Sequence, residues 1–130
     1  MKLLNISLVT AVFAVSCMTS GMHAKISTVK TEAELDTILN NGKKPYTVVK
    51  FWKEECQPCE ELAPHFEKVA SELHNKVNFV AVEGPSELSR KYKIGGFPKT
   101  LYFKNGKKMS KDGTRNVNRL KEDIQGAFGL

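Results

Sequence analysis

Hydrophobic residues follow two different spacings along this chain. Residues 46–52 form a continuous β-branched and aromatic run after Pro45, which predicts a buried strand. Residues 77–82 predict a second central strand and residues 100–103 a third. The segment after the first strand shows helical spacing instead, which predicts an amphipathic helix. Its apolar positions are Leu62, Phe66, Val69, Ala70 and Leu73, and Pro64 inside it predicts a kink.

Turn and cap residues mark the remaining elements in the first half. Residues 26–29 alternate weakly and predict a short strand. Thr31 and Glu34 form a capping-box pattern that predicts the start of a helix, and the pair Asn41-Gly42 predicts its end. Residues 85–92 predict a further short helix.

A hairpin and a helix are predicted to close the chain. Asn105-Gly106 is a strong hairpin signal, followed at residues 107–111 by a lysine-rich segment suited to the edge of a sheet. Asn116 is placed to cap a last helix with Val117 and Ile124 facing inward. Alternating strands and helices in this order predict an α/β fold, a mixed central β-sheet flanked by helices on both faces.

The amino terminus is predicted to lie outside this fold. A single Lys2 precedes a short apolar run up to Val15, and no acidic residue occurs before Glu32, which is typical of a secretory signal peptide. We therefore divide the chain into a signal peptide at 1–24 and one domain at 25–130, located in the periplasm or secreted. Two alternatives are a lipoprotein anchored through Cys17 and an uncleaved membrane anchor.

Composition and charge agree with one soluble globular domain. The chain has 130 residues, of which 41% are hydrophobic and 26% charged, enough for one core. The net charge of +6 raises the question of a nucleic-acid partner. The excess lysines and arginines are spread over several predicted elements without interleaved aromatic residues. We therefore interpret them as a solvated surface and expect no nucleic-acid partner.

The strongest chemical signal is the pair Cys56 and Cys59, which follows a predicted strand and opens a predicted helix. Two cysteines so close in sequence staple a domain poorly, so their retention in an exported chain suggests chemistry. Backbone N–H groups and the helix dipole favour a thiolate at the helix start. We expect Cys56 to be the exposed attacking thiol and Cys59 the more buried resolving thiol, with a mixed disulfide between the two steps.

Other uses of the pair are less well supported. A zinc site needs two more ligands, and the histidines at 23, 65 and 74 do not form a second cluster. Haem attachment requires a histidine directly after Cys59, where the chain has Glu60. A purely structural disulfide stays an alternative. We find no phosphate-binding loop and no flavin or nicotinamide motif in the sequence, so we expect neither a cofactor nor a metal. Electrons are then expected to be exchanged with another protein or a small thiol.

The cysteine segment, with other motifs, resembles the thioredoxin family over about residues 26–128. The matching residues are Phe51-Trp52, Cys56-Gln57-Pro58-Cys59, Pro64, Gly96-Phe97-Pro98 and Phe103-Lys104-Asn105-Gly106. The resemblance implies a thioredoxin-like fold and a cis peptide bond at Pro98, facing the cysteine pair. It also implies a substrate groove, whose expected residues are Trp52, Gln57, Pro58, Phe97 and Pro98.

Four positions depart from the family's usual pattern. Glu55 stands where a second tryptophan is usual, and Lys50 where a buried aspartate is usual. Gln57 replaces a glycine, and Lys99 replaces the threonine common after the cis proline. A protonated Lys50 cannot act as the aspartate does, although it can favour a nearby thiolate or extend outward to solvent.

These features predict an exported enzyme that exchanges disulfides with protein cysteines. The glutamates around the pair, Glu54, Glu55, Glu60 and Glu61, disfavour a thiolate and favour a reductase or isomerase over a strong oxidase. The expected partners are substrate proteins and a redox partner protein, in solution or in the membrane, and the expected state is a monomer. The alternative is a thioredoxin-like binding module with little redox turnover.

Overall fold

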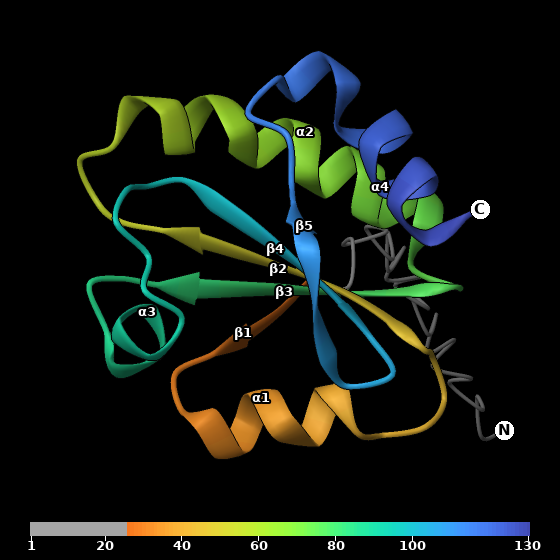
Figure 1. The fold of residues 1–130 in the computed structure, drawn as a ribbon. Helices are drawn as coiled ribbons and strands as arrows, with labels where there is room; N and C mark the ends of the chain where they lie inside the picture. Colours follow the sequence, from red (N-terminus) through yellow and green to blue (C-terminus); the bar gives the residue numbers. More distant parts are fainter. Residues whose placement is uncertain (1–25) are drawn as a thin grey trace, which may run out of the picture.

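The computed structural model describes residues 26–130, so the predicted signal peptide and Cys17 lie outside the described residues. The core of the domain is one five-stranded sheet in the order β1-β3-β2-β4-β5 (Figure 1). The parallel neighbours are β1, β3 and β2, whereas β4 is antiparallel to both β2 and β5. The predicted mixed sheet is confirmed. The strands are β1 (Ile26–Val29), β2 (Tyr46–Trp52), β3 (Val77–Glu83), β4 (Lys99–Lys104) and β5 (Lys107–Asp112).

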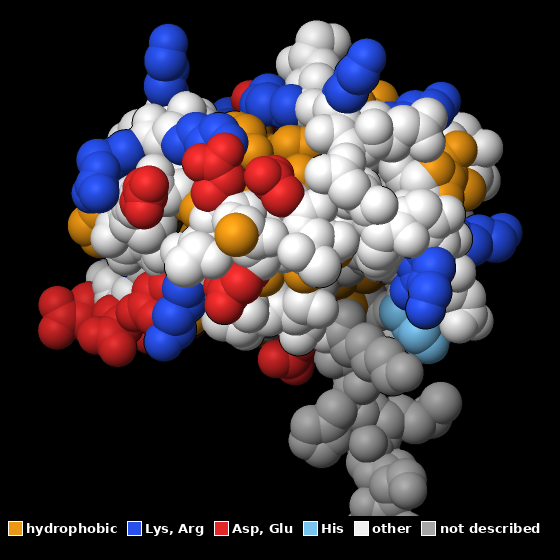
Figure 2. Space-filling view, turned by 90° about the horizontal axis from the view of Figure 1, so that it is seen from below, with side chains coloured by type: hydrophobic (Ala, Val, Ile, Leu, Met, Phe, Trp, Pro, Cys, Tyr) orange, Lys and Arg blue, Asp and Glu red, His pale blue; other side chains and the backbone are white. Residues whose placement is uncertain are grey.

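Helices cover both faces of the sheet. Helices α2 (Gln57–Leu73) and α4 (Leu120–Phe128) lie on one face, and α1 (Glu32–Leu39) and α3 (Glu87–Lys91) lie on the other (Figure 1). Within residues 26–130, no helix has the length and apolar character needed to cross a membrane. Seen from the α1 side, acidic and basic side chains both occur on the surface, in agreement with a solvated face (Figure 2).

Strand β2 contributes side chains to both halves of the core, because successive side chains of a strand point to opposite faces. Val48 belongs to the cluster under α2 and α4, whereas Val49 and Phe51 belong to the cluster under α1 and α3. The same alternation places Lys50 and Trp52, two and four residues after Val48, on the α2 face. A charged side chain and an indole therefore face the helix that carries the cysteines.

The helix boundaries follow from their caps. The predicted capping box of Thr31 and Glu34 is confirmed at the start of α1. The predicted helix at 85–92 is shorter, because Ser86 is extended and its hydroxyl accepts the Ser89 N–H at 3.2 Å. Asn116 caps a 3₁₀ turn, η1 (Val117–Arg119), and α4 begins only after that turn.

The predicted hairpin between β4 and β5 is also confirmed. Asn105 and Gly106 both adopt positive φ, 50° and 77°, the conformation that favours Asn-Gly in two-residue turns. Gly106 also packs closely on α1, since a Cβ there would meet the Asn40 side-chain oxygen at 2.7 Å. The hairpin therefore fixes the end of β4 opposite the functional site.

Candidate functional site

Cys56 and Cys59 form a disulfide at the start of α2, with their Cα atoms 5.2 Å apart. Cys56 is the N-cap of the helix, and its sulfur accepts the backbone N–H of Cys59 at 3.3 Å. Pro58 lies in the first helical turn, where a missing N–H costs no helical hydrogen bond. Just before the helix, Glu55 adopts a positive φ of 53°. The local sequence thus places the first sulfur at the positive end of a helix.

The two cysteines are equally buried, with exposures of 5% for Cys56 and 4% for Cys59. The expectation that Cys56 would be clearly more exposed is therefore wrong for the disulfide form. The chain before Pro98 provides the reason, because the Phe97 carbonyl oxygen lies 3.7 Å from the Cys56 sulfur. Exposure in the disulfide form therefore does not distinguish the two sulfurs, whereas their places in the helix do.

A groove of about 390 Å³, here called the Pro98 groove, lies on one side of the disulfide. Pro58 and Leu62 of α2 line it together with the segment Gly96–Thr100 and, opposite, Gly113–Arg115. The Phe97–Pro98 peptide bond is cis, the geometry that the family resemblance implies, and so is the Gly84–Pro85 bond. Three of the expected substrate residues, Pro58, Phe97 and Pro98, are thus brought together.

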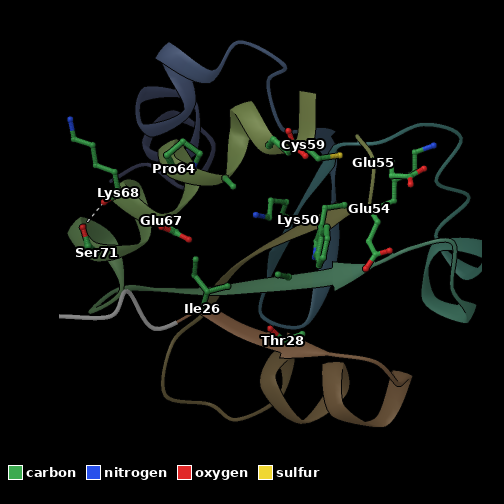
Figure 3. A pocket seen from close by; sticks show the side chains of 15 residues that line it. Ile26, Thr28, Lys50, Glu54, Glu55, Cys59, Pro64, Glu67, Lys68 and Ser71 are labelled. Atoms are coloured by element: carbon green, nitrogen blue, oxygen red, sulfur yellow. Dashed lines mark hydrogen bonds between the residues drawn. The ribbon is translucent and has the colours of Figure 1, made fainter. Parts of the chain in front are cut away.

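A larger cavity of about 1040 Å³, here called the Lys50 cavity, lies on the other side, against Cys59 (Figure 3). Trp52 lines this cavity and not the Pro98 groove, so the expected single groove with Phe97 and Pro98 is divided in two. Gln57 is exposed and lines neither hollow, and its amide lies 3.4 Å from Glu61. The cysteine-bearing start of α2 separates the two hollows.

Lys50 is the main charged group at the base of this cavity, with only 7% of its surface exposed. Its ammonium nitrogen lies 4.7 Å from the centre of the Phe66 ring, in cation–π range. Burial lowers the pKa of Lys50 below its usual range, and the Glu67 carboxylate acts in the opposite direction. Sequence reasoning missed Glu67, although it follows Cys59 by eight residues and therefore shares its helix face.

A second group of side chains missed by sequence reasoning fixes the far wall of the Pro98 groove. The Tyr102 hydroxyl and the Thr114 N–H donate to one oxygen of Asp123 at 2.5 Å and 3.1 Å, and Lys111 pairs with the other at 2.8 Å. Burial favours a higher pKa for Asp123, but these donors outweigh it and hold the pKa below its usual value. Burial and the bond to Asp123 raise the pKa of Tyr102.

The described residues supply no group of three or more metal-ligating side chains close enough together to hold a metal ion. The cysteines are joined to each other, and neither His65 nor His74 lies among the residues of the two hollows. The disulfide at the start of α2, whose first sulfur accepts a backbone N–H, points to reversible chemistry at the sulfur–sulfur bond.

Known proteins are similar in sequence and fold to most of this chain. The thioredoxin family matches residues 26–126. A thioredoxin of Mycoplasmoides gallisepticum is 36% identical over 96 residues, which cover 72% of this chain and 94% of the relative. A probable protein disulfide-isomerase A4 of Caenorhabditis elegans is 33% identical over 79 residues, which cover 61% of this chain and 12% of the relative. The solved structure of Fasciola hepatica thioredoxin has a TM-score of 0.69 and 29% identity, covering 77% of this chain and 97% of its own. This chain therefore belongs to the thioredoxin family and is a thiol–disulfide oxidoreductase with the redox-active pair Cys56 and Cys59.

Proposed function

We propose that this protein is exported and exchanges disulfides with the cysteines of other proteins, acting chiefly as a reductase or isomerase. Export rests on the composition of residues 1–24, a basic residue followed by a short apolar run. The mature domain then works in the periplasm or outside the cell. The alternative form stays attached to a membrane through a lipid on Cys17.

In the proposed cycle Cys56 is the nucleophile and Cys59 the resolving thiol. The Cys56 thiolate attacks a substrate disulfide, one substrate sulfur leaves with the electron pair, and a mixed disulfide forms. Cys59 then attacks Cys56, which releases the second substrate thiolate and restores the Cys56–Cys59 bond. The observation that supports this order is the position of Cys56 as N-cap of α2, where its sulfur accepts a backbone N–H.

The direction of the reaction is argued from the acidic residues around the disulfide. Glu54, Glu55 and Glu60 line the Lys50 cavity and Glu61 lines the Pro98 groove, and all four are exposed. Negative charge disfavours the thiolates of the reduced protein and so favours its oxidation. A pair that is easily oxidised is a good reductant for its substrates.

The Pro98 groove is the proposed site for the substrate chain. An extended segment lying beside Pro98 would place its cysteine near Cys56, with Pro58 and Phe97 as the walls. The protein would act as a monomer and receive electrons from a partner protein in solution or in the membrane, or from a small thiol.

The first test is the reduction potential of the pair, measured by equilibration in glutathione or dithiothreitol buffers. We expect a value at or below about −230 mV, toward the thioredoxin end of the known range. A value near about −120 mV would instead assign the protein as a strong oxidant and overturn the proposed direction.

The second test separates the enzyme from the binding module. In a Cys17→Ser background, Cys56→Ser should abolish reduction of a protein disulfide, whereas Cys59→Ser should trap the mixed disulfide on Cys56. Persistence of partner binding in the Cys56→Ser variant, together with no exchange by the unaltered pair, would support the binding module.

A further inference from the structure

Lys50 is a buried amine directly behind the cysteine pair. Strand β2 directs it at the α2 face, and it lines the same cavity as Cys59. Figure 3 shows the side chain beneath Cys59, with its amine directed toward Glu67. The amine makes no hydrogen bond with the described residues, so a buried basic group without a hydrogen-bonded partner shares the cavity with the resolving sulfur.

The other charges of the Lys50 cavity lie at its rim and are exposed, in contrast to Lys50. Exposed charges are screened by water and salt, whereas a buried charge keeps most of its field over a few ångströms. The titratable groups that face Lys50 across the cavity come from α2 and from the loop before it, and the lining residues from β1 and β3 do not titrate. These groups are Cys59, Glu60, Glu67, Lys68, Lys53, Glu54 and Glu55.

In the resolving step, Cys59 has to ionise in surroundings that oppose its ionisation. While Cys56 is tied to the substrate, Cys59 must lose its proton before it can attack. Unlike Cys56, it does not occupy the N-cap of α2, and the surrounding glutamates oppose its ionisation. A positive charge in the cavity that Cys59 also lines favours this ionisation.

We propose that Lys50 is a positioning residue that stabilises the Cys59 thiolate in the mixed disulfide, and that Glu67 compensates its charge while the disulfide is intact. This inference rests on the proposed function. The flexible lysine side chain allows the ammonium group to approach either partner. The glutamates around the pair oppose ionisation of its thiols and so favour a reductant. Lys50 offsets this effect on ionisation at Cys59 alone.

The electron balance of the assisted step is simple. The Cys59 proton leaves through the open cavity to water, and the thiolate attacks the Cys56 sulfur. The new Cys56–Cys59 bond forms as the bond from Cys56 to the substrate breaks, and the substrate sulfur departs with the electron pair as a thiolate. The cysteine pair is oxidised and the substrate disulfide is reduced, while Lys50 keeps its proton throughout.

The experiment isolates Cys59 in the full-length chain. In a Cys17→Ser/Cys56→Ser background Cys59 is the only cysteine, and thiolate absorbance measured against pH gives its ionised fraction. We expect Lys50→Met to lower the thiolate fraction at pH 7 about tenfold. The matched control is Lys68→Met, which removes the same charge from the exposed rim of the same cavity and should leave the fraction unchanged.

A second variant with the opposite sign keeps the test decisive. Glu67→Gln removes the compensating charge and should raise the Cys59 thiolate fraction, and circular dichroism verifies that each variant is folded. Equal thiolate fractions in the parent, Lys50→Met and Glu67→Gln would overturn the inference.

With both cysteines present, Lys50→Met should also slow release of the mixed disulfide about tenfold at pH 7. Loss of exchange by the unaltered pair would contradict the proposed function instead. The two failures are therefore distinguishable.

Discussion

The two hollows beside the disulfide differ in what lines them. The Pro98 groove is smaller, and it combines prolines, glycines and apolar side chains with three charged residues, Glu61, Lys99 and Arg115. The Lys50 cavity is larger and is ringed by charges of both signs around an indole and a buried amine. The contrast teaches that the two sides of one disulfide can serve different tasks. The groove suits the recognition of a peptide segment, and the cavity suits control of ionisation at Cys59.

The largest structural effect is expected from a change at Gly84, which packs against Phe97 of the Pro98 groove. A Cβ on Gly84 would lie 2.5 Å from two ring carbons of Phe97, so Gly84→Ala must displace that ring. Overpacking of this kind costs about 1–3 kcal/mol of unfolding free energy, measurable in urea. We also expect a higher KM for a protein disulfide, with the Cys59 thiolate fraction unchanged.

The control for Gly84→Ala is the same substitution in a Phe97→Ala background, where the Phe97 ring is absent. Combined with Phe97→Ala, Gly84→Ala should cost little beyond Phe97→Ala alone, because the space is then free. Should Gly84→Ala instead change the thiolate fraction of Cys59, the two hollows would be coupled and the separation of tasks would fail.

An intermediate effect is expected at the far wall of the groove. Tyr102→Phe removes the hydroxyl that donates to Asp123 and should cost about 1 kcal/mol at neutral pH. Because the folded protein depresses the pKa of Asp123, the stability from this carboxylate is present above its unfolded value and is lost as pH falls through the lower, folded one.

The difference in unfolding free energy between the parent and Tyr102→Phe should therefore narrow below about pH 4. Denaturant melts across pH 2–7 measure it. Tyr46→Phe, a hydroxyl deletion at a half-buried tyrosine, serves as the control and should show no such pH dependence. A constant difference down to pH 2 would contradict the assignment of Asp123.

The smallest effect is expected outside both hollows. Lys121 of α4 pairs with Glu72 of α2 at 2.8 Å, with both side chains well exposed. Exposed pairs of this kind contribute little, so Lys121→Met should leave thermal stability and substrate exchange unchanged in physiological salt. A clear loss of disulfide exchange in this variant would show that the surface around Lys121 is functional in addition to the two hollows.

Local patterns were enough to predict most of the fold. The β-branched run of β2 and the capping box at Thr31 depend on neighbours in sequence, and both elements form where expected. The predicted boundaries were wrong where caps decided them, at Ser86 and at Asn116, because a cap depends on hydrogen-bond geometry beyond residue type.

The site was predicted less completely than the fold. The two cysteines lie close together in the sequence and were found. The placement of Trp52 and Pro98 in different hollows depends on the start of α2, which lies between them in space. The burial of Cys56 depends on a carbonyl forty-one residues away. The groups around Asp123 and Lys50 likewise join distant elements, so no local spacing reveals them.

The lysines of β5 have a consequence for the behaviour of many molecules together. Lys107, Lys108 and Lys111 stand exposed on the edge strand, and the pairing of β4 with β5 shifts register between Leu101 and Phe103. An unpaired strand edge is a template for aggregation, and positive charges with irregular pairing hinder a second edge from docking. At high concentration, this edge therefore repels its copies and helps to keep the protein dispersed.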